Sequence, residues 1–495
     1  MSVAVAQAQD PLVLALDIGS SASRARVFDA MGTPVRGMKA RIAHGITTAP
    51  DGTAVLDADG ILHEVEQLIS LVLAGKRTGT RIAGVIMDTF ASSLVGVDAS
   101  LTALTPCYTY ADARPAAQVS TLRAEFDEAV LQQRTGCRLS TSYLPARLRW
   151  LAETRPELAA RVTRWLSLGE YIYAHLTGSF ATSYSTAAWS GLLDRAAGAW
   201  DLSLVEASRA RPEQFSAIRD TREPLTDVGT AVGARWPALG QAAWFPAIAD
   251  GYASNVGSGA TDATVIALAA ATSGALRVLV DGVPAHVPPG LWCYRVDRRR
   301  SLYGGALNDV GRVLAWLGGT LKLPPEAIQN DALLAPPEGT TPVVLPFLTG
   351  ERSPGWAAGA RALFAEISVA TTPLAIFRGA MEGVALRYAL IAEHLREVAP
   401  AAERVLASGG VTELLPGWLQ LAADALNRPV TRVDQQQATL RGAALIALDV
   451  LVPDVRRAPA ATAETYAPFP GHAPYYTEAR ARQEALYNAL MRRPT

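Results

Sequence analysis

The chain has 495 residues, of which 49% are apolar and 18% are charged, and its formal net charge is −1. This composition is typical of a globular protein with a large core, and the length predicts two or more domains. The nearly neutral charge gives no basis for a nucleic-acid groove or an anionic membrane surface as partner.

The cysteines, the N-terminus and the apolar segments indicate where in the cell the protein would be found. Cys107, Cys137 and Cys293 are widely spaced and contain no CxxC pair, so neither a disulfide framework nor a zinc site is expected, and a reducing cytoplasm fits best. The N-terminus lacks the pattern of a signal peptide. Polar residues interrupt the most apolar long window, 263–280, so no membrane span is predicted.

The N-terminal region is predicted to be α/β. Leu12–Ile18 is a nearly continuous apolar run, typical of a strand buried on both faces. Strands at 23–29 and 35–42 follow, joined by a turn around Gly32. Apolar residues between 61 and 73 then recur at helical spacing, and 81–88 returns to strand.

The second half of the chain repeats this pattern. Residues 140–175 are predicted to be helical, with Pro156 starting a new helix. The Gly-rich segment 244–259 follows, and we place a domain boundary near it. Residues 263–280 then read as strand, small-residue turn and strand, which predicts a duplicated domain. A strand, Gly-Gly turn and helix at 405–430 and a helix at 438–451 complete the pattern.

The first predicted strand ends near an acid that is followed by small polar residues. A Gly-rich turn after a strand can present N–H groups and hydroxyls to phosphate, and an acid at the strand end suits Mg²⁺. The segment therefore predicts Asp17 at a metal ion and residues 19–24 facing a polyphosphate. An ordinary hairpin with a polar turn is the alternative. The chain contains no GxxxxGK[ST] P-loop.

Asp250 is the second candidate for chemistry. It follows apolar residues and precedes Gly251, where the backbone can approach a ligand. A carboxylate in this position can accept a hydroxyl proton during phosphoryl transfer. The alternative is a structural Asp in a Gly-rich turn. The scattered His residues form no metal-binding pattern.

Several segments, in this order, resemble the FGGY family of carbohydrate kinases in the actin-like ATPase superfamily. They are "LALDIGSSASRARVFD", "TPCYTYADARP", "YLPARLRWLAET", "ADGYASNVGSG", "AATSGALRV", "GGALNDVGRVLAWL", "PFLTGERSPGW" and "SGGVTELLPGWLQLAADALNRPV". The resemblance implies an α/β fold with two ribonuclease-H-like domains, 1–252 and 253–495, whose mixed sheets are flanked by helices around a central cleft.

The resemblance also implies roles for individual residues. Asp250 would be the general base that deprotonates the substrate hydroxyl, and Asp17 and Asp250 would lie at Mg²⁺. The residues implied to contact ATP are Gly19, Ser20, Ser21, Ser23, Arg24, Thr272, Ser273, Gly274, Gly305, Gly409 and Gly410. The residues implied to contact the sugar are Ser92, Ser93, Tyr110, Arg114, Tyr143 and Asp250.

The implied substrate is less sharply defined than the reaction. Xylulose kinases usually show Met-His-Gly where this chain has Ala91, Ser92 and Ser93. The sequence of the segment "GERSPGW" is most similar to the gluconokinase-type branch. The resemblance thus favours ATP-dependent phosphorylation of D-gluconate, with Arg114 and Arg147 as partners of its carboxylate. Ribulose, xylulose, glycerol and erythritol are alternative substrates. A non-catalytic actin-like ATP-binding protein is the alternative class. Family members are often homodimers, but no segment identifies an interface.

Overall fold

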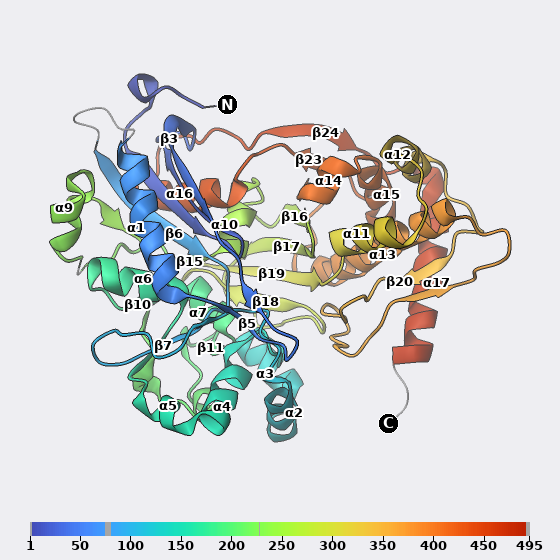
Figure 1. Cartoon of the computed structure of the whole chain (residues 1–495). Coiled ribbons are helices and arrows are strands. Elements are labelled where there is room, and N and C mark those ends of the chain that lie inside the picture. Colours follow the sequence, from blue (N-terminus) through green and yellow to red (C-terminus); the bar gives the residue numbers. More distant parts are fainter. Residues whose placement is uncertain (1, 75–80, 227, 492–495) are drawn as a thin grey trace.

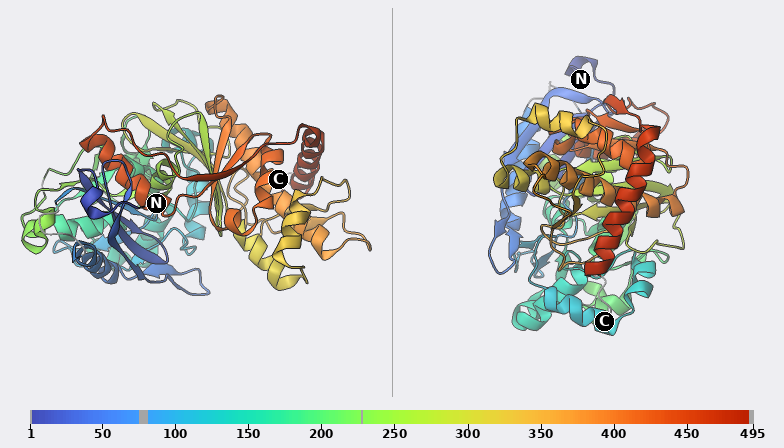
Figure 2. Two further views of the ribbon diagram at one scale, coloured as in Figure 1. Left: turned by 90° about the horizontal axis from the view of Figure 1, so that it is seen from above. Right: turned by 90° about the vertical axis from the view of Figure 1, so that its right-hand side faces the viewer.

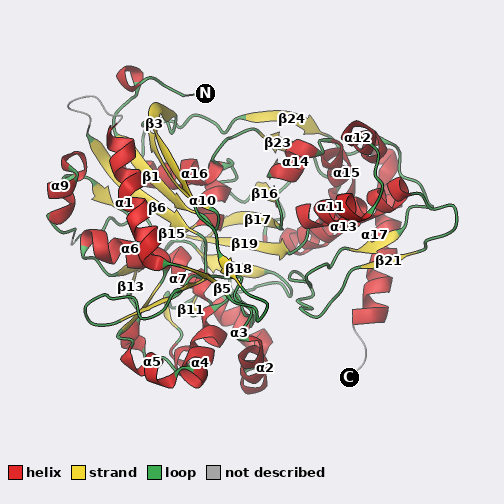
Figure 3. Cartoon of the chain, viewed as in Figure 1, coloured by secondary structure: helices red, strands yellow, loops and turns green. Residues whose placement is uncertain are grey.

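The computed structural model describes residues 2–74, 81–226 and 228–491, which form two α/β halves (Figure 1). Each half is built on one large mixed sheet. Figure 3 shows the strands of both sheets in the interior of the molecule, with helices packed along them. This arrangement agrees with the fold class that the sequence predicts.

The first sheet has the strand order β14–β6–β1–β2–β3, and β15 also pairs with β6. β1 to β3 form an antiparallel meander, while β6 runs parallel to β1 and β14 and β15 run parallel to β6. All seven residues of β1 are buried, as the apolar run predicts. The strands are β1 (Leu12–Ile18), β2 (Ala22–Phe28), β3 (Pro34–Ala43), β6 (Ile82–Thr89), β14 (Ala243–Trp244) and β15 (Ile248–Ala249).

The second sheet has the order β18–β19–β17–β16–β22–β23–β24. β16, β17 and β19 are antiparallel neighbours, and β22 and β23 run parallel to β16. The order around β16 therefore repeats the order around β1, as the predicted duplication requires. The strands are β16 (Val265–Ala270), β17 (Gly274–Asp281), β18 (Trp292–Arg295), β19 (Arg300–Leu307), β22 (Arg404–Ser408), β23 (Val430–Val433) and β24 (Thr462–Tyr466).

Helices cover both sheets. α1 (Ala58–Ala74) and α6 (Leu168–Thr177) share a core with one face of the first sheet, and the apolar residues of α1 point into it. α13 (Pro373–Val398) and α15 (Gly417–Leu426) share the largest core with the second sheet. α17 (Ala473–Met491) lies outside α13 and α15 on the surface of the second half (Figure 2).

One helix from the end of the chain returns to the first half. α16 (Ala438–Leu451) packs on β1 and β6 and crosses α10 (Asp250–Gly257), and Figure 2 shows it beside the blue N-terminal elements. The crossing is close because Gly257 and Gly442 have no side chain: a Cβ atom would lie 1.7 Å from the Ala438 carbonyl oxygen and 1.8 Å from the Ala253 carbonyl oxygen. The predicted boundary at 252/253 thus falls inside α10 and remains a prediction.

The predicted helical region 140–175 needs one correction. Pro156 starts α5 (Pro156–Arg161) after α4 (Leu144–Thr154), as expected, but the short strand β9 (Arg164–Leu166) separates α5 from α6. β9 forms because it pairs with β7 (Val95–Val97), a partner distant in sequence.

The remaining elements are short and lie between these main ones. Those of the first half are β4 (Thr47–Thr48), β5 (Ala54–Leu56), β8 (Cys107–Tyr108), α2 (Ala116–Glu125), α3 (Glu128–Thr135), β10 (Ala181–Ser183), α7 (Tyr184–Ser190), β11 (Leu193–Asp194), β12 (Ala199–Trp200), α8 (Leu202–Ala207), β13 (Ala217–Arg219) and α9 (Ala231–Arg235). Those of the second half are α11 (Gly311–Thr320), α12 (Glu326–Leu334), β20 (Val343–Leu345), β21 (Leu363–Ala365) and α14 (Gly410–Leu414). Within the described ranges, no helix has the length and apolar character needed to cross a bilayer.

Candidate active site

Three acidic residues meet at the carboxyl-terminal edge of the first sheet. Asp17 on β1 is the Cα partner of Asp88 on β6, and β15, which also pairs with β6, leads directly into Asp250. Parallel strands end at the same edge of a sheet, so the three side chains are neighbours. Sequence reasoning identified Asp17 and Asp250 but missed Asp88, although the acid stands out in the apolar run of β6.

Asp88 is the most unusual of the three. Its side chain is fully buried, and neither carboxyl oxygen has a hydrogen-bond partner among the described residues. Burial raises the pKa of Asp88 well above its usual range, and the charges of Asp17 and Asp250 raise it further. Its position thus favours the protonated form of Asp88 more than water would at the same pH.

We expect Asp88→Asn to stabilise the protein at high pH. An acid whose pKa is raised by folding contributes no penalty at low pH, but it costs stability as pH rises through its pKa in the folded protein. In EDTA, the melting temperature of the variant minus that of wild type should increase between pH 5 and pH 8. A difference that is independent of pH would show that Asp88 does not carry this raised pKa.

Asp250 is the first residue of α10, so it lies at the start of a helix and not in the Gly-rich turn that was the alternative. It is half-buried, and the Gly251 N–H donates to its Oδ1 at 2.7 Å. Burial raises the pKa of Asp250 to about 6; the charge of Asp17 raises it too, while Arg277 lowers it. A carboxylate with a pKa close to neutrality suits a general base.

The first predicted phosphate turn joins β1 to β2. Ser20 is partly exposed and Ser21 exposed, and the Gly19 N–H donates to the Ala22 carbonyl at 3.1 Å. Arg24 lies opposite Asp17 and its Nη1 donates to Asp17 Oδ2 at 3.0 Å. The turn thus presents hydroxyls and a cation next to Asp17, as the phosphate hypothesis requires.

Ser23 is a residue of the first predicted phosphate turn whose hydroxyl bonds another part of the chain. Its side chain is fully buried and its Oγ donates to Glu64 Oε2 at 2.9 Å. Successive side chains of a strand point to opposite faces, so Ser23 points toward α1 while Arg24 points away from it. The same Glu64 bonds His44 Nδ1 at 2.9 Å, and His44 Nε2 bonds the Gly19 carbonyl at 2.8 Å. Ser23 therefore belongs to a network that holds the turn.

The second predicted phosphate turn joins β16 to β17. The side chains of Thr272 and Ser273 are exposed, whereas Gly274 is buried. A Cβ atom on Gly274 would lie 1.7 Å from the Tyr388 hydroxyl, so no larger residue fits. This turn remains a candidate for phosphate binding.

The Gly-Gly turn lies at the same edge of the second sheet, because β22 runs parallel to β16. Gly409 has a φ of +108°, which favours glycine, and Gly410 is exposed with open space around it. A cavity of about 530 Å³ lies beside α14, with Leu314, Lys322 and Leu414 among its lining residues. These features leave room for a nucleoside.

Gly305 lies in the middle of β19, paired with Leu276, and a Cβ atom there would lie 2.9 Å from atoms of Ile391. The glycine therefore allows α13 to pack on the sheet, and its proposed position at the nucleotide remains a prediction.

The predicted sugar contacts from the first half are divided between exposed and buried positions. Tyr110 is 40% exposed and packs edge-to-face on Phe90. Ser92 has a φ of +60°, and its Oγ donates to the Trp189 carbonyl at 2.5 Å. Ser93 is buried and its Oγ accepts from the Leu168 N–H at 3.0 Å. Ser93 thus supports α6, and its hydroxyl is occupied.

The two arginines predicted to hold a substrate carboxylate have other partners. Arg114 forms an ion pair with Asp112 at 2.5 Å, and its guanidinium lies 4.6 Å from the Trp150 ring centroid. Arg147 is fully buried and donates to the carbonyls of Ser92, Thr109 and Thr141. These contacts engage most of the donors of both guanidiniums, which argues against the two arginines as the carboxylate clamp.

Tyr143 leads to a group of residues that sequence reasoning missed. Its hydroxyl lies 2.6 Å from the Tyr294 hydroxyl. Tyr294 stacks on Trp189 with 3.8 Å between ring centroids and on Trp292 with 4.4 Å. Trp189 belongs to α7, whereas Trp292 and Tyr294 belong to β18, so the stack bridges the two halves. Aromatic faces of this kind commonly line small-molecule sites.

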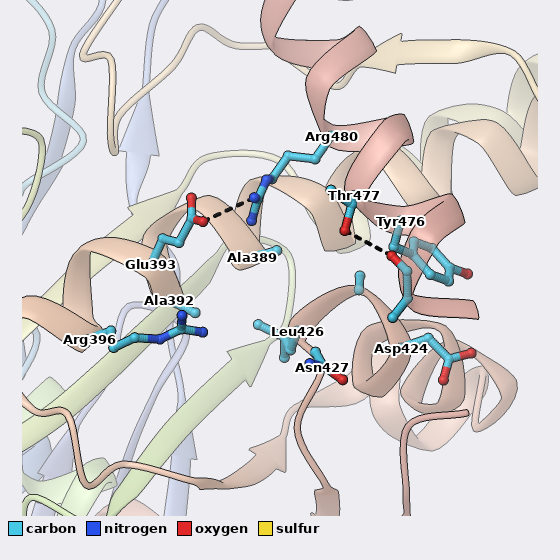
Figure 4. Close-up of a pocket in the computed structure, with 12 residues that line it drawn as sticks. Ala389, Ala392, Glu393, Arg396, Asp424, Leu426, Asn427, Tyr476, Thr477 and Arg480 are labelled. Carbon is cyan, nitrogen blue, oxygen red and sulfur yellow. Dashed lines mark hydrogen bonds and ion pairs between the residues drawn. The ribbon is translucent and has the colours of Figure 1, made fainter. Parts of the chain in front are cut away.

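A further pocket lies between α13, α15 and α17, away from the predicted site. Its volume is about 200 Å³, and none of its lining residues is a predicted site residue. Figure 4 shows Arg480 of α17 paired with Glu393 of α13 at one side, with a distance of 3.0 Å. We assign no ligand to this pocket.

The donor set fits Mg²⁺ with a nucleotide better than a metal bound by protein alone. In the described part of the chain, no group of three or more His, Cys, Asp or Glu residues could hold a metal ion. Mg²⁺ commonly takes one or two carboxylates and completes its shell with water and phosphate oxygens. Asp17 and Asp250, which interact electrostatically, suit that mode.

Known proteins agree with this geometry. Residues 12–257 match the N-terminal domain of the FGGY family of carbohydrate kinases, and residues 265–448 match its C-terminal domain. The chain is 23% identical to a gluconokinase of Bacillus subtilis over 449 residues, which cover 88% of this chain and 87% of that protein.

Two solved structures show the same fold. A gluconate kinase from Lactobacillus acidophilus has 25% identity and a TM-score of 0.89, covering 97% of this chain and 98% of its own. A xylulose kinase from Rhodospirillum rubrum has 23% identity and a TM-score of 0.90, covering 97% and 99%. Since these kinases differ in substrate, the similarity defines the class of reaction and leaves the sugar open.

Proposed function

Because this chain belongs to the FGGY family of carbohydrate kinases, we propose that it transfers the γ-phosphate of ATP to a hydroxyl group of D-gluconate. The chain is a phosphotransferase with an alcohol group as acceptor, which favours the enzyme over the non-catalytic ATP-binding alternative. The identity of the sugar and the roles of the residues are the proposal.

The position of Asp250 carries the proposed mechanism. The substrate hydroxyl oxygen forms a bond to the γ-phosphorus, the bond from that phosphorus to the oxygen of ADP breaks, and the hydroxyl proton passes to the Asp250 carboxylate. The N-terminal end of α10 provides partial positive charge near Asp250. Positioning and electrostatics supply most of the catalysis in this kind of reaction.

The nucleotide would bind between the two turns identified above. Ser20, Ser21 and Arg24 would contact phosphate from the first half, and Thr272 and Ser273 from the second. Asp17 would hold Mg²⁺, which neutralises phosphate charge when it is bound. Gly409 and Gly410 would lie near the adenosine, next to the cavity beside α14.

Gluconate is favoured by similarity to kinases that act on it. A gluconokinase and a gluconate kinase are among the relatives. Ribulose, xylulose, glycerol and erythritol are the competing substrates, and a xylulose kinase is equally similar in fold. We also propose a cytoplasmic location, since the three cysteines are free thiols buried in the protein. A homodimer remains a prediction.

A substrate panel tests the proposal. We expect Mg²⁺ and ATP to support ADP formation with D-gluconate at a kcat/KM at least about tenfold above that for D-xylulose, D-ribulose, glycerol or erythritol, because each lacks the carboxylate. A coupled assay measures ADP, and mass spectrometry confirms the phosphorylated product. ATP hydrolysis without any acceptor is the control. A preference for one of the neutral compounds would retain the kinase and refute gluconate.

A further inference from the structure

Arg277 is a charged residue in the middle of an otherwise apolar strand. On β17, Leu276 and Val278 point into the core of the second half, while Leu279 belongs to the core that contains Tyr143, Tyr252 and Trp292. Because side chains alternate along a strand, Arg277 shares the face of Leu279 and points toward the first half. It is partly exposed.

The guanidinium of Arg277 lies over the start of α10. A Cβ atom built on Gly251 would lie 3.7 Å from both Nε and Nη2 of Arg277 and 3.0 Å from Cζ2 of Trp189. Gly251 directly follows Asp250, the proposed base. Arg277 and the aromatic stack that begins with Trp189 thus border the position of the reacting hydroxyl.

The side chain of Arg277 has no hydrogen bond or ion pair within the described residues, and its buried Nε has no partner. Asp250 is its strongest electrostatic partner, but the two do not form an ion pair within 4.0 Å. Arg352 is a second arginine with a buried, unpartnered Nε, and it repels Arg277. Two neighbouring guanidiniums without a paired carboxylate are costly unless an anion joins them.

We propose that Arg277 is the specificity-determining residue that pairs with the carboxylate of a sugar-acid substrate. The inference rests on the proposed kinase function and replaces Arg114 and Arg147 in the role of carboxylate partner. The planar guanidinium presents parallel N–H groups that match a carboxylate bidentately. Arg352 adds positive charge, and the stack of Trp189, Tyr294 and Trp292 offers apolar faces to the carbon chain of the sugar.

Two other roles for Arg277, phosphate binding and control of the pKa of Asp250, explain fewer of these observations. The phosphate turn at 272–274 lies at the start of β17 with its own exposed hydroxyls, and Arg24 supplies the cation beside Asp17. An arginine that only lowered the pKa of Asp250 would not need a second unpaired guanidinium, that of Arg352, beside it. A carboxylate ligand accounts for both unpaired guanidiniums.

The test compares D-gluconate with D-glucitol, which has the same carbon chain but a CH₂OH group in place of the carboxylate. We expect wild type to prefer gluconate in kcat/KM by at least about 100-fold, since a buried charged group left unpaired weakens binding of the neutral analogue. In Arg277→Gln, kcat/KM for gluconate should fall about 100-fold, mostly through KM, while the value for glucitol should change less than about threefold. Arg277→Lys should retain part of the preference.

Arg480→Gln is the matched control. Arg480 of α17 forms an ion pair with Glu393 of α13 at the surface, away from the proposed site. It should leave both substrates unchanged. Equal losses for gluconate and glucitol in Arg277→Gln would overturn the proposal, since they would show that Arg277 acts on Asp250 or on the fold. Wild type that prefers glucitol or binds gluconate no better than glucitol would also overturn it, even if Arg277→Gln does not fold.

Calorimetry separates this inference from the proposed function. One outcome is that gluconate binds to wild type without turnover and binds about 100-fold more weakly to Arg277→Gln. This outcome would support Arg277 as the partner of the carboxylate but refute the kinase reaction on gluconate. If the protein phosphorylates a neutral sugar and binds no sugar acid detectably, the kinase function would stand and the proposed role of Arg277 would be overturned. Both measurements use the full chain with Mg²⁺ and a non-hydrolysable ATP analogue.

Discussion

Replacing Asp250 with Asn is expected to lower kcat about 10²–10⁴-fold with the true substrate, because the substrate hydroxyl loses its general base. The amide has nearly the same shape as the carboxylate and can still accept the Gly251 N–H, which lies 2.7 Å away. The fold and the affinity for ATP should therefore remain close to wild type. Steady-state kinetics and circular dichroism check both parts.

The pH dependence gives an independent signature of the same base. Because burial raises the pKa of Asp250 to about 6, the base gains a proton as pH falls through that value, and wild-type kcat/KM should decrease below it. Asp250→Asn should lose this acidic limb. The matched control is Asp262→Asn, in an exposed loop, which should keep both rate and profile. A wild-type rate in Asp250→Asn would eliminate the general-base role.

The sheets could be predicted from the sequence because their signal is local. An apolar run interrupted only by Asp17 predicts β1, and the structure buries all seven of its residues. The two apolar runs in 263–280, separated by a small-residue turn, likewise predict β16 and β17. β9 could not be predicted in this way, since three residues form a strand only when β7 is present to pair with them.

The site could be predicted only where a residue's role depends on its own segment. Asp17 and Asp250 each stand at the end of a strand that the sequence shows. The contacts of Ser23 and Gly305 with Glu64 and Ile391 could not be predicted, because these partners are distant in sequence. A polar residue in a turn-like segment does not reveal whether its hydroxyl faces a ligand or a helix.

Asp88 and Arg277 were missed although both carry a sequence signal. Each is a charged residue that directly follows apolar residues of a strand, and such a residue commonly has a functional or structural partner. The sequence could not show that the partner is absent within the chain. Only the assembled structure shows that Asp88 meets two other acids, and that Arg277 lies near both Asp250 and Arg352 without forming an ion pair.

Arg387→Met is expected to cost about 3–5 kcal/mol of folding free energy, because it leaves a buried carboxylate without its cation. Arg387 of α13 pairs with Glu351, and both side chains are almost fully buried. Glu351 also accepts from the Tyr487 hydroxyl at 2.6 Å and from the Gly355 N–H at 3.2 Å. It therefore fixes the loop that carries Arg352 to two helices of the second half.

A double variant separates the ion pair from the packing of Arg387. Glu351→Gln keeps the oxygen that accepts from Tyr487 and Gly355 but removes the charge, so combining it with Arg387→Met should cost less than the two single changes added together. Urea unfolding at pH 7 measures all three variants. If Arg387→Met alone costs less than about 1 kcal/mol, as exposed pairs do, the loop is not held by this pair. The sugar specificity attributed to Arg277 and its neighbour Arg352 would then have to depend on other contacts of the loop, such as the bond from Trp356 Nε1 to the Gly290 carbonyl at 2.9 Å.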